Sequence, residues 1–528
     1  MSKKTAKQTT RKVRSVSSQS AVPPQAQAEG REGDNAAERL VKFVESRYRL
    51  GLSNEGEPFA VPHHGPNVAI LFAEDGEFRE TLAADYREYA GQLVGSFGVT
   101  TAFECLKGMA RRKKKESLPI RVARHGDEWV IDMADETGRV IVVTPGEGWR
   151  VDPRSPVPFR RSSSQMPHVE PCGGATLDQL REALGMPIEK WSLVLAWMLS
   201  TFITGVPRTI LALEGSGGSG KSSLMKRILD VVDPTSAAMA SDPRSMRDWQ
   251  SVAWSRHVVS LDNISVIHPW FSDVLCRAST GDAGSGRALY HEKKVSITAL
   301  QVSVVMTTTG IDIARNDLEQ RMLFVPVSAM QDDDRKTMRN LTVHWSEFRP
   351  SALGALLDAL ATVIPWLDKV QPPTLPRMAD FGQLLAAMDA AQISHGAFEA
   401  YLSSIAQSNQ DAASRSVFVR ALTSVVGQCR GWRGTPTQLV DAVACRVHWS
   451  ERKELPGPRA VMARLEDARR GLLAKGISFQ FKKGQARSIE FLYEPIDGIA
   501  IANDDEPTGR LESRRLGIEP DSVMSIPY

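Results

Sequence analysis

The sequence predicts a mixed α/β protein of several domains, and three observations lead to this class. Its 528 residues suffice for three or four domains at about 150 residues each. An apolar strand at residues 209–213 runs directly into a glycine-rich loop and an amphipathic helix, an arrangement typical of a parallel α/β unit. Short alternating segments between residues 120 and 143 predict a small antiparallel sheet, and two helices followed by a hairpin are predicted near the C-terminus.

The composition excludes several classes of protein. Hydrophobic residues make up 42% and charged residues 24% of the chain, which excludes a wholly disordered or collagen-like chain. The net charge of +3 is too small to indicate a polyanionic partner by itself. Five cysteines without a C-x-x-C pair argue against a disulfide-rich secreted protein. The apolar stretch 191–206 is shorter than the roughly 20 residues of a membrane-spanning helix, so we expect a soluble, cytoplasmic protein without a membrane partner.

The N-terminal part is expected to comprise three segments. Residues 1–36 begin with six Lys or Arg in the first 15 positions and are predicted to form a disordered basic tail, either a solvated extension or an arm that grasps nucleic acid. Residues 37–150 are predicted to form a small α+β domain. In it, Asp132 and Asp135 are three positions apart on a strand, hence on opposite faces, and are not expected to share a metal ion. Residues 151–175, rich in Pro, Ser and Gly, are predicted to be a linker.

The glycine-rich loop carries the first functional signal. Residues 215–222 fit the pattern G-x-x-x-x-G-K-[ST] between a predicted strand and a predicted helix, which is the context of a phosphate-binding P-loop. Glycines let backbone N–H groups surround a phosphate at the helix N-terminus. Lys221 would neutralise phosphate oxygens, and the Ser222 hydroxyl would coordinate Mg²⁺. The predicted ATP-binding residues are Gly215, Ser216, Gly217, Gly218, Ser219, Gly220, Lys221, Ser222 and Ser223.

A P-loop needs an acidic residue on a neighbouring strand to hold the magnesium ion. Asp262 follows an apolar segment and is predicted to bind the metal together with the loop serine. The next residue, Asn263, orients water but cannot accept its proton, so turnover is expected to be slow or to use another base, for which Asp282 is a candidate. A third apolar segment ends in the run Thr307–Thr309, whose polar side chains could hydrogen-bond the γ-phosphate or the attacking water. Arg321 lies just before a fourth apolar segment. It is either a plain surface arginine or an arginine that reaches a nucleotide on a neighbouring subunit.

The order of these motifs is similar to that of superfamily 3 helicases, above all the branch found in primase–helicases of phages, plasmids and poxviruses and in related ATP-binding proteins of mobile elements. The resemblance is good over residues 177–345, weaker to residue 495 and thin before residue 150. It implies an AAA+-like P-loop NTPase core with its leading helices at 176–335 and a helical lid at 336–410. The motifs that carry it are Gly215–Ser222, Asp262, Thr280–Asp282, Arg287–Tyr290, Val304–Thr309 and Asp317–Arg321.

The resemblance also implies roles for single residues. Lys221, Asp262, Thr309 and Arg321 would be catalytic, with Arg321 the arginine finger offered to the next subunit of a homo-hexamer. A hairpin loop would point into a central pore and grip DNA phosphates. Asn263, where an acid is common, and Thr309, in place of a sensor asparagine, depart from the family pattern and bear on the turnover rate more than on nucleotide binding. The predicted DNA-binding residues of the hairpin are Arg287, His291, Lys293 and Lys294.

The C-terminal part is predicted to be a second nucleic-acid-binding unit. Residues 411–493 hold fifteen Lys or Arg against seven Asp or Glu, a net charge of +8. Helices predicted at 436–447 and 458–473, followed by a hairpin, favour a winged helix at 411–495, and a lid extension with solvated arginines is the alternative. Residues 496–528 are predicted to be an acidic disordered tail. The DNA contacts predicted here are Arg459, Arg464, Lys482 and Lys483.

The sequence as a whole predicts an enzyme that couples Mg²⁺-dependent ATP hydrolysis to movement along single-stranded or forked DNA. It would be a replication helicase of a phage, plasmid or integrated element, working with other replication proteins. The alternative is a nucleotide-gated DNA-binding assembly or loading ATPase without unwinding activity, which the departures at Asn263 and Thr309 favour. A small-molecule P-loop kinase is a third interpretation, and it leaves the basic C-terminal unit unexplained.

Overall fold

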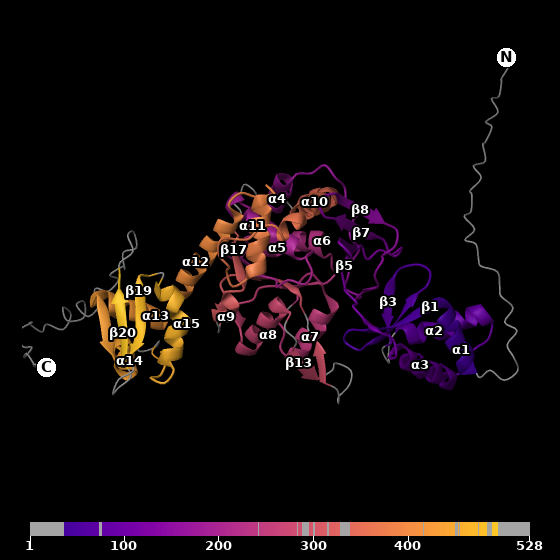
Figure 1. Cartoon of the computed structure of the whole chain (residues 1–528), viewed down its shortest axis with the longest axis horizontal. Coiled ribbons are helices and arrows are strands. Elements are labelled where there is room, and N and C mark those ends of the chain that lie inside the picture. Colours follow the sequence, from indigo (N-terminus) through magenta and orange to yellow (C-terminus); the bar gives the residue numbers. More distant parts are fainter. Residues whose placement is uncertain are drawn as a thin grey trace, which may run out of the picture. The chain divides into compact units, whose positions relative to one another are not determined.

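The structure is a computed structural model with a mixed α/β architecture and several separate sheets (Figure 1), which confirms the predicted class. Its contacts divide the chain into a smaller unit, Met1–Leu118 with Pro158–Arg160, and a larger one, Pro119–Val157 with Arg161–Tyr528. The residues that the structure describes are 36–72, 77–240, 242–281, 284–287, 295–298, 301–313, 316–327, 338–415, 417–448, 452, 455–473, 475–482 and 488–494.

The smaller unit combines a five-stranded sheet, in the order β4-β1-β2-β3-β9, with three helices. In its first helix, Leu40, Phe43 and Val44 are buried because their spacing of three and four places them on one helical face. They join a core with Phe72 and Phe103. The elements are α1 (Ala36–Arg47), β1 (Tyr48–Ser53), β2 (Pro58–Pro62), β3 (Val68–Leu71), α2 (Glu77–Ala90), α3 (Ser96–Ala110), β4 (Lys115–Glu116) and β9 (Phe159–Arg160).

The antiparallel sheet predicted between residues 120 and 143 is present, but it belongs to the larger unit. Its alternating residues Ile131, Ile141 and Val143 lie in the main core of that unit, and the Trp149 indole N–H donates to Asp358 at 2.9 Å. The smaller unit therefore ends at Leu118, not at residue 150 as predicted, because the apolar face of this sheet is buried against the later helices. The strands are β5 (Val122–His125), β6 (Glu128–Asp132), β7 (Val140–Thr144) and β8 (Gly148–Asp152).

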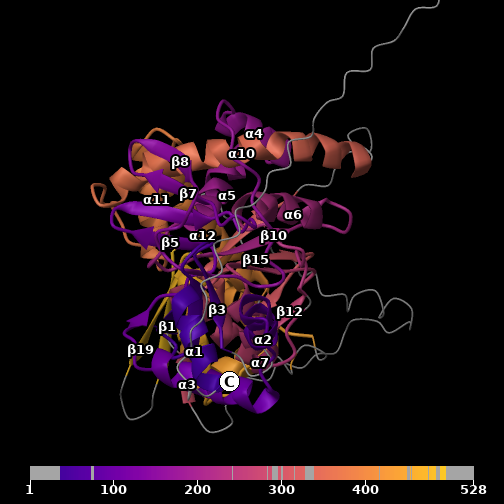
Figure 2. The same cartoon turned by 90° about the vertical axis from the view of Figure 1, so that its right-hand side faces the viewer.

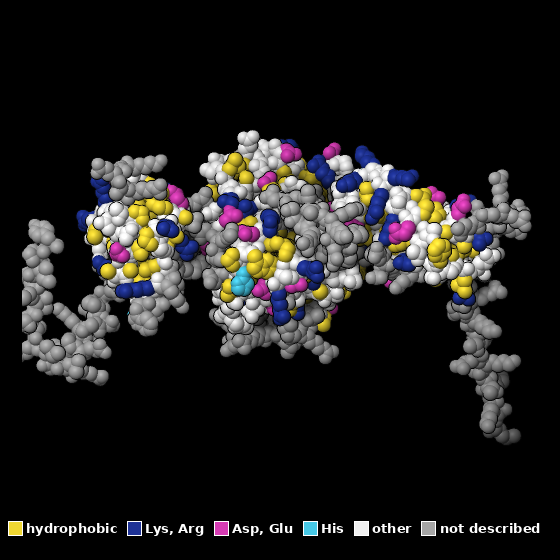
Figure 3. Space-filling view, turned by 90° about the horizontal axis from the view of Figure 1, so that it is seen from below, with side chains coloured by type: hydrophobic (Ala, Val, Ile, Leu, Met, Phe, Trp, Pro, Cys, Tyr) yellow, Lys and Arg dark blue, Asp and Glu magenta, His cyan; other side chains and the backbone are white. Residues whose placement is uncertain are grey.

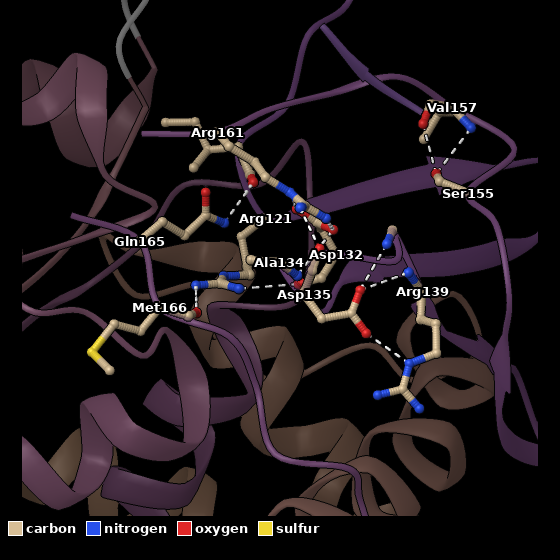
Figure 4. Close-up of polar contacts among 12 residues, drawn as sticks. Arg121, Asp132, Ala134, Asp135, Arg139, Ser155, Val157, Arg161, Gln165 and Met166 are labelled. Carbon is tan, nitrogen blue, oxygen red and sulfur yellow. Dashed lines mark hydrogen bonds and ion pairs between the residues drawn. The ribbon is translucent and has the colours of Figure 1, made fainter. Parts of the chain in front are cut away.

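The segment predicted to be a linker is fixed by polar contacts in its middle part (Figure 4). Arg161 donates to both carboxylate oxygens of Asp132 at 2.9 and 2.7 Å, and Asp132 is only 1% exposed. The Gln165 amide donates to a backbone carbonyl at the start of the sheet at 3.1 Å. Asp135 instead binds Arg139 at 2.6 Å. The two aspartates thus neutralise different arginines, and the segment is part of the folded unit.

The centre of the larger unit is a four-stranded parallel sheet in the order β11-β15-β10-β17. Strand β10 pairs in parallel with β15 on one side and with β17 on the other, so the chain leaves β10 at the middle of the sheet. All positions of β11 and β15 are buried, which agrees with their mainly apolar residues and the absence of charged ones, as in strands covered on both faces. The strands are β10 (Ile210–Glu214), β11 (Val258–Leu261), β15 (Ser303–Thr308) and β17 (Met322–Pro326).

Helices cover both faces of this sheet, and the alternation of side chains assigns each face to its layer. Leu211 and Leu213 pack in the core of α5 and α6, whereas Ile210 and Ala212 pack in the core of α7 and α8. Figure 2 shows α6 between the strands and the later helix α10. The helices of the two layers are α4 (Leu177–Leu184), α5 (Ile188–Ser200), α6 (Lys221–Val232), α7 (Met246–Ser255) and α8 (Pro269–Thr280).

Three further helices, α10 (Met338–Leu367), α11 (Ala379–Ala390) and α12 (Ala397–Arg415), follow the sheet. The stretch Val343–Leu367 is long and apolar enough to cross a membrane. Its side chains Leu353, Leu356 and Leu360 are fully buried in the main core, which is the packing of a core helix. Short elements complete this part: β12 (Val266–Ile267), β13 (Gly284–Arg287), β14 (Val295–Thr298), β16 (Asp312–Ile313) and α9 (Asn316–Glu319).

The C-terminal elements form three helices and a three-stranded antiparallel sheet in the order β18-β20-β19. They share a core of their own that includes Phe418, Leu439, Leu465 and Phe491. The helices and hairpin predicted here are observed, each within a few residues of its expected range. They are α13 (Val417–Gln428), β18 (Gly431–Gly434), α14 (Pro436–Ala444), α15 (Val461–Leu473), β19 (Ile477–Lys482) and β20 (Ser488–Tyr493).

Candidate nucleotide-binding site

The glycine-rich loop connects the end of the central strand β10 to the first residue of α6. Gly218 and Gly220 have φ values of 80° and 87°, a region in which only glycine is at ease. Gly215 lies so close to the next strand that a Cβ atom would overlap the carbonyl oxygen of Val327. Helix α6 begins at Lys221, and its N-cap residue Gly220 provides no side-chain cap, so its first N–H groups face the loop and favour an anion there.

Lys221 is buried at this helix start and is held by the loop itself. Its ammonium group donates to the carbonyl oxygens of Gly215 and Ser216, both at 2.6 Å, and the residue is 8% exposed. It also donates to the Ser219 hydroxyl at 3.4 Å. A buried cation whose hydrogen-bond partners here are neutral oxygens supplies positive charge to the loop. The loop thus combines a fixed cation with free backbone donors, which is the chemistry of phosphate recognition.

A hydroxyl–carboxylate cluster lies beside the loop. The Ser222 hydroxyl donates to Oδ1 of Asp262 at 2.8 Å, and the Thr307 hydroxyl donates to the same oxygen at 2.6 Å. The Asn263 backbone N–H in turn donates to the Thr307 hydroxyl at 2.8 Å. Asp262 follows β11 and Thr307 lies in the adjacent strand β15, so the sheet brings these side chains to one edge. Hydroxyl and carboxylate oxygens are the ligands that Mg²⁺ prefers.

Of the three threonines predicted at the end of β15, Thr307 contacts Asp262, and the role predicted for Thr309, toward the γ-phosphate or the attacking water, stays a prediction. Thr309 and Asn263 are both exposed at the same end of the sheet. The run of three threonines was the available signal, and sequence alone could not tell which of them turns toward the carboxylate. The alternative base Asp282 lies outside the described residues.

Arg321 lies at the opposite edge of the sheet from the loop. Its backbone carbonyl accepts a hydrogen bond from the N–H of Ile210, the first residue of β10. The glycine-rich loop begins at the other end of β10, after the last residue of that strand, Glu214. Five strand residues span about 16 Å, so Arg321 does not contact the loop of its own chain. Its side chain is 14% exposed and lies 3.7 Å from the carboxylate of Asp317.

The predicted DNA contacts fall into two places. Arg287 ends β13, which pairs with β14 as the expected hairpin; its side chain and the tip residues His291, Lys293 and Lys294 lie outside what the structure describes, as does Lys483. Among the C-terminal residues, Arg459 and Arg464 are exposed. Lys482 is ion-paired with Glu490 of the neighbouring strand, so its charge is partly neutralised.

The sequence analysis missed a buried ion pair that connects two elements of the site, α6 and β11. Arg121, which is fully buried, donates to Oδ1 of Asp233 at 2.8 Å, just after α6. The other oxygen of Asp233 accepts the N–H of Val258, the first residue of β11, at 2.9 Å. The pair therefore joins the end of the loop helix to the strand that leads to Asp262. Its members are 112 positions apart in the chain, and no local pattern announces them.

Among the described residues, no group of three or more His, Cys, Asp or Glu gathers as a metal cluster. The Asp262 carboxylate and the Ser222 hydroxyl beside the loop are instead the sparse set that Mg²⁺ uses when phosphates supply the remaining ligands.

Comparison with solved structures gives only distant likenesses. The apo A form of the NrS-1 C-terminal region has a TM-score of 0.40 at 10% identity, covering 86% of this chain and 98% of that one. A second apo structure of that region, residues 305–718, has a TM-score of 0.39 at 10% identity, covering 87% and 99%. The JCV helicase has a TM-score of 0.24 at 12% identity, covering 44% and 66%. TM-scores this low do not establish a shared fold.

No curated protein matches the chain. A family model does match: that of the actinomycete integrative conjugative element replication protein, over residues 180–411. The matched segment includes the glycine-rich loop, Asp262, Thr307 and Arg321. The part of the chain that carries the candidate site is therefore similar to replication proteins of integrative conjugative elements.

Proposed function

We propose that the protein is an ATPase of the superfamily 3 helicase type that couples ATP hydrolysis to movement along DNA during replication of a mobile element. The observation that carries this proposal is the meeting of Lys221, Ser222 and Asp262 at the glycine-rich loop, at the end of the central strand of a parallel sheet. Ligands bind at this edge of open α/β sheets. The family match over residues 180–411 supports the replication role.

In this proposal the loop binds the ATP phosphates. Lys221 exchanges its two loop carbonyls for phosphate oxygens, and the N–H groups at the start of α6 surround the β-phosphate. Ser222 and Asp262 fit Mg²⁺, since one hydroxyl and one carboxylate leave the remaining positions to phosphates and water. A bound Mg²⁺ would neutralise charge on the phosphates. Thr307 fixes the orientation of the Asp262 carboxylate, and Thr309 and Asn263 are placed to orient water.

The position of Arg321 favours assembly into a ring. Because it lies at the opposite edge of the sheet from its own loop, an arginine finger at this position serves the nucleotide of a neighbouring copy. A guanidinium supplied in this way stabilises charge on the transferring phosphoryl group. A homo-hexamer is the assembly that the resemblance implies.

Two surfaces are proposed to bind DNA, single-stranded or forked. The β13–β14 hairpin carries the predicted pore loop. The C-terminal elements, proposed to act as a winged helix, present mainly basic side chains around a hydrophobic patch on the face drawn in Figure 3. Arg459 and Arg464 of this part of the chain are exposed. The protein would act in the cytoplasm with other replication proteins.

The test is ATP hydrolysis with and without single-stranded DNA for the wild type and for Lys221→Ala. Lys226→Ala is the matched control, because Lys226 is an exposed lysine on the same helix, five positions on. We expect DNA-stimulated hydrolysis that Lys221→Ala abolishes and Lys226→Ala retains. Absence of hydrolysis in the wild type under all DNA conditions would refute the proposal.

A second candidate is a nucleotide-gated DNA-binding or loading ATPase that does not unwind. Asn263 favours it, because an amide stands where a base would activate water, and its side chain is exposed. Strand displacement on a forked duplex separates the two candidates. Hydrolysis that accompanies displacement supports the motor, and nucleotide-dependent DNA binding without displacement supports the second candidate.

A further inference from the structure

One carboxylate, just before β17, forms ion pairs with two arginines from different parts of the chain. Asp317, in the short helix α9, is ion-paired with Arg321 at 3.7 Å through Oδ2 and with Arg377 through Oδ1. Arg377 precedes α11 and also donates to Oε1 of Gln320 at 3.4 Å. Figure 1 shows α9 beside α8 in this region. The helical segment after the sheet thus contributes a second guanidinium at the position of the candidate finger.

The charges and exposure of this cluster suit an incoming anion. Two guanidiniums share one carboxylate, which leaves a net charge of +1. Arg377 is 38% and Asp317 46% exposed at the side chain, so the pair is accessible, while Arg321 is 14% exposed. The Nε atom of Arg321 is buried and makes no hydrogen bond within the described part of the chain. Paired guanidinium forks match the oxygens of phosphate groups.

A buried thiol lies beside the Asp317 carboxylate of this cluster. Cys276 of α8 is 9% exposed, and burial together with the neighbouring Asp317 carboxylate raises its pKa to about 12. The thiol therefore stays neutral and does not offset the two arginines.

Neither arginine is placed to serve the loop of its own chain. Both bind Asp317 beside the start of β17, and the register pairs Ile210 at the start of β10 with Met322. The loop lies beyond the other end of β10, a strand length of about 16 Å away.

We infer that Arg377 is a second arginine of a site shared between copies: it contacts phosphate oxygens of the nucleotide held by the glycine-rich loop of a neighbouring copy, and Asp317 is a positioning residue that aligns Arg321 and Arg377. This inference rests on the proposed ATPase function. It deepens that function by naming a residue from the segment after the sheet that completes the site in trans.

The experiment measures ATP turnover and binding of a fluorescent ATP analogue for Arg377→Ala, Arg377→Lys and the control Lys369→Ala. Lys369 is exposed and eight positions earlier, over the Trp366 ring. We expect Arg377→Ala and Arg377→Lys to lose at least tenfold in turnover, since an ammonium does not replace the guanidinium fork, and to bind the analogue as the wild type does. Arg377→Lys keeps a cation beside Asp317, so we expect it to fold, and it carries the test if Arg377→Ala does not fold.

Mixing Arg377→Lys with Lys221→Ala then tests whether the arginine acts on a neighbour. In a random 1:1 ring, about one quarter of the head-to-tail interfaces combine an intact loop with an intact arginine, so we expect about one quarter of the wild-type turnover to return. Turnover of Arg377→Lys at the wild-type level, or no recovery on mixing, would overturn the inference while leaving a hydrolysing wild type. A wild type without hydrolysis would instead overturn the proposed function and the inference with it.

Discussion

Replacing Arg121 by alanine tests whether the β5–β8 sheet is built into the larger unit, which carries the candidate nucleotide-binding site. Arg121 is fully buried and donates to Asp233 at 2.8 Å and to three backbone carbonyl oxygens at 3.0–3.2 Å. Figure 4 shows two of these carbonyl contacts, to Asp132 and Met166. Removal of Arg121 leaves the Asp233 carboxylate, which is 6% exposed, with the N–H of Val258 as its remaining hydrogen-bond partner among the residues that the structure describes. Breaking a buried pair in this way costs about 3–5 kcal/mol, so we expect the free energy of unfolding of the larger unit to fall by that amount.

Urea titration followed by tryptophan fluorescence measures the loss, with Arg124→Ala as the matched control. Arg124 is three positions later, 55% exposed, and pairs with Asp127, which is 98% exposed. Such surface pairs contribute about 0–1 kcal/mol, so the same substitution should have little effect there. A loss below about 1 kcal/mol for Arg121→Ala would refute the reasoning, because it would place the pair in the range of a solvated contact.

Three further predictions concern the larger unit and a packed glycine. Burial lowers the pKa of His257 to about 4, so the unfolded chain binds its proton first, and stability should fall by up to about 3 kcal/mol as the pH drops from 6.5 to 4; His257→Gln should flatten this part of a urea-unfolding pH series. Thr307→Val removes the hydroxyl that fixes Asp262, so the Mg²⁺ concentration that gives half-maximal turnover should rise by about 10–100-fold in a Mg²⁺ titration. Gly354→Ala in α10 should destabilise by about 1–3 kcal/mol because its Cβ would overlap the Cys172 carbonyl oxygen. The same change at Gly108, where no atom lies within 4 Å, should stabilise by up to about 1 kcal/mol in thermal unfolding.

The loop and its carboxylate could be predicted because their signals are local. Glycines at 218 and 220 are required by backbone conformations with positive φ, and Lys221 and Ser222 follow at fixed spacing. Asp262 stands at the end of an apolar strand, and parallel strands bring their ends to one edge. Each of these features can therefore be recognised in a stretch of about ten consecutive residues.

The remainder depends on contacts between distant segments, which leave no such pattern. Alternation predicts the β5–β7 strands equally well whichever unit buries their apolar face, so the boundary at Leu118 could not be read from the chain. Arg161 in a stretch rich in proline and serine gives no sign that it binds Asp132. Arg377 lies 60 positions from Asp317, and only the fold brings the two together.

These long-range contacts connect the two ends of the parallel sheet. At the start of β11, Asp233 binds both the backbone and Arg121; at its end, Asp262 holds the loop serine. At the start of β17, Asp317 aligns two arginines. The interior of a sheet is rigid and transmits small displacements, so in the proposed ring a change in phosphate contacts at the loop edge would displace the opposite edge of β10, where Arg321 and Arg377 lie. If successive copies meet loop edge to arginine edge, this sheet is the shortest path between consecutive nucleotides.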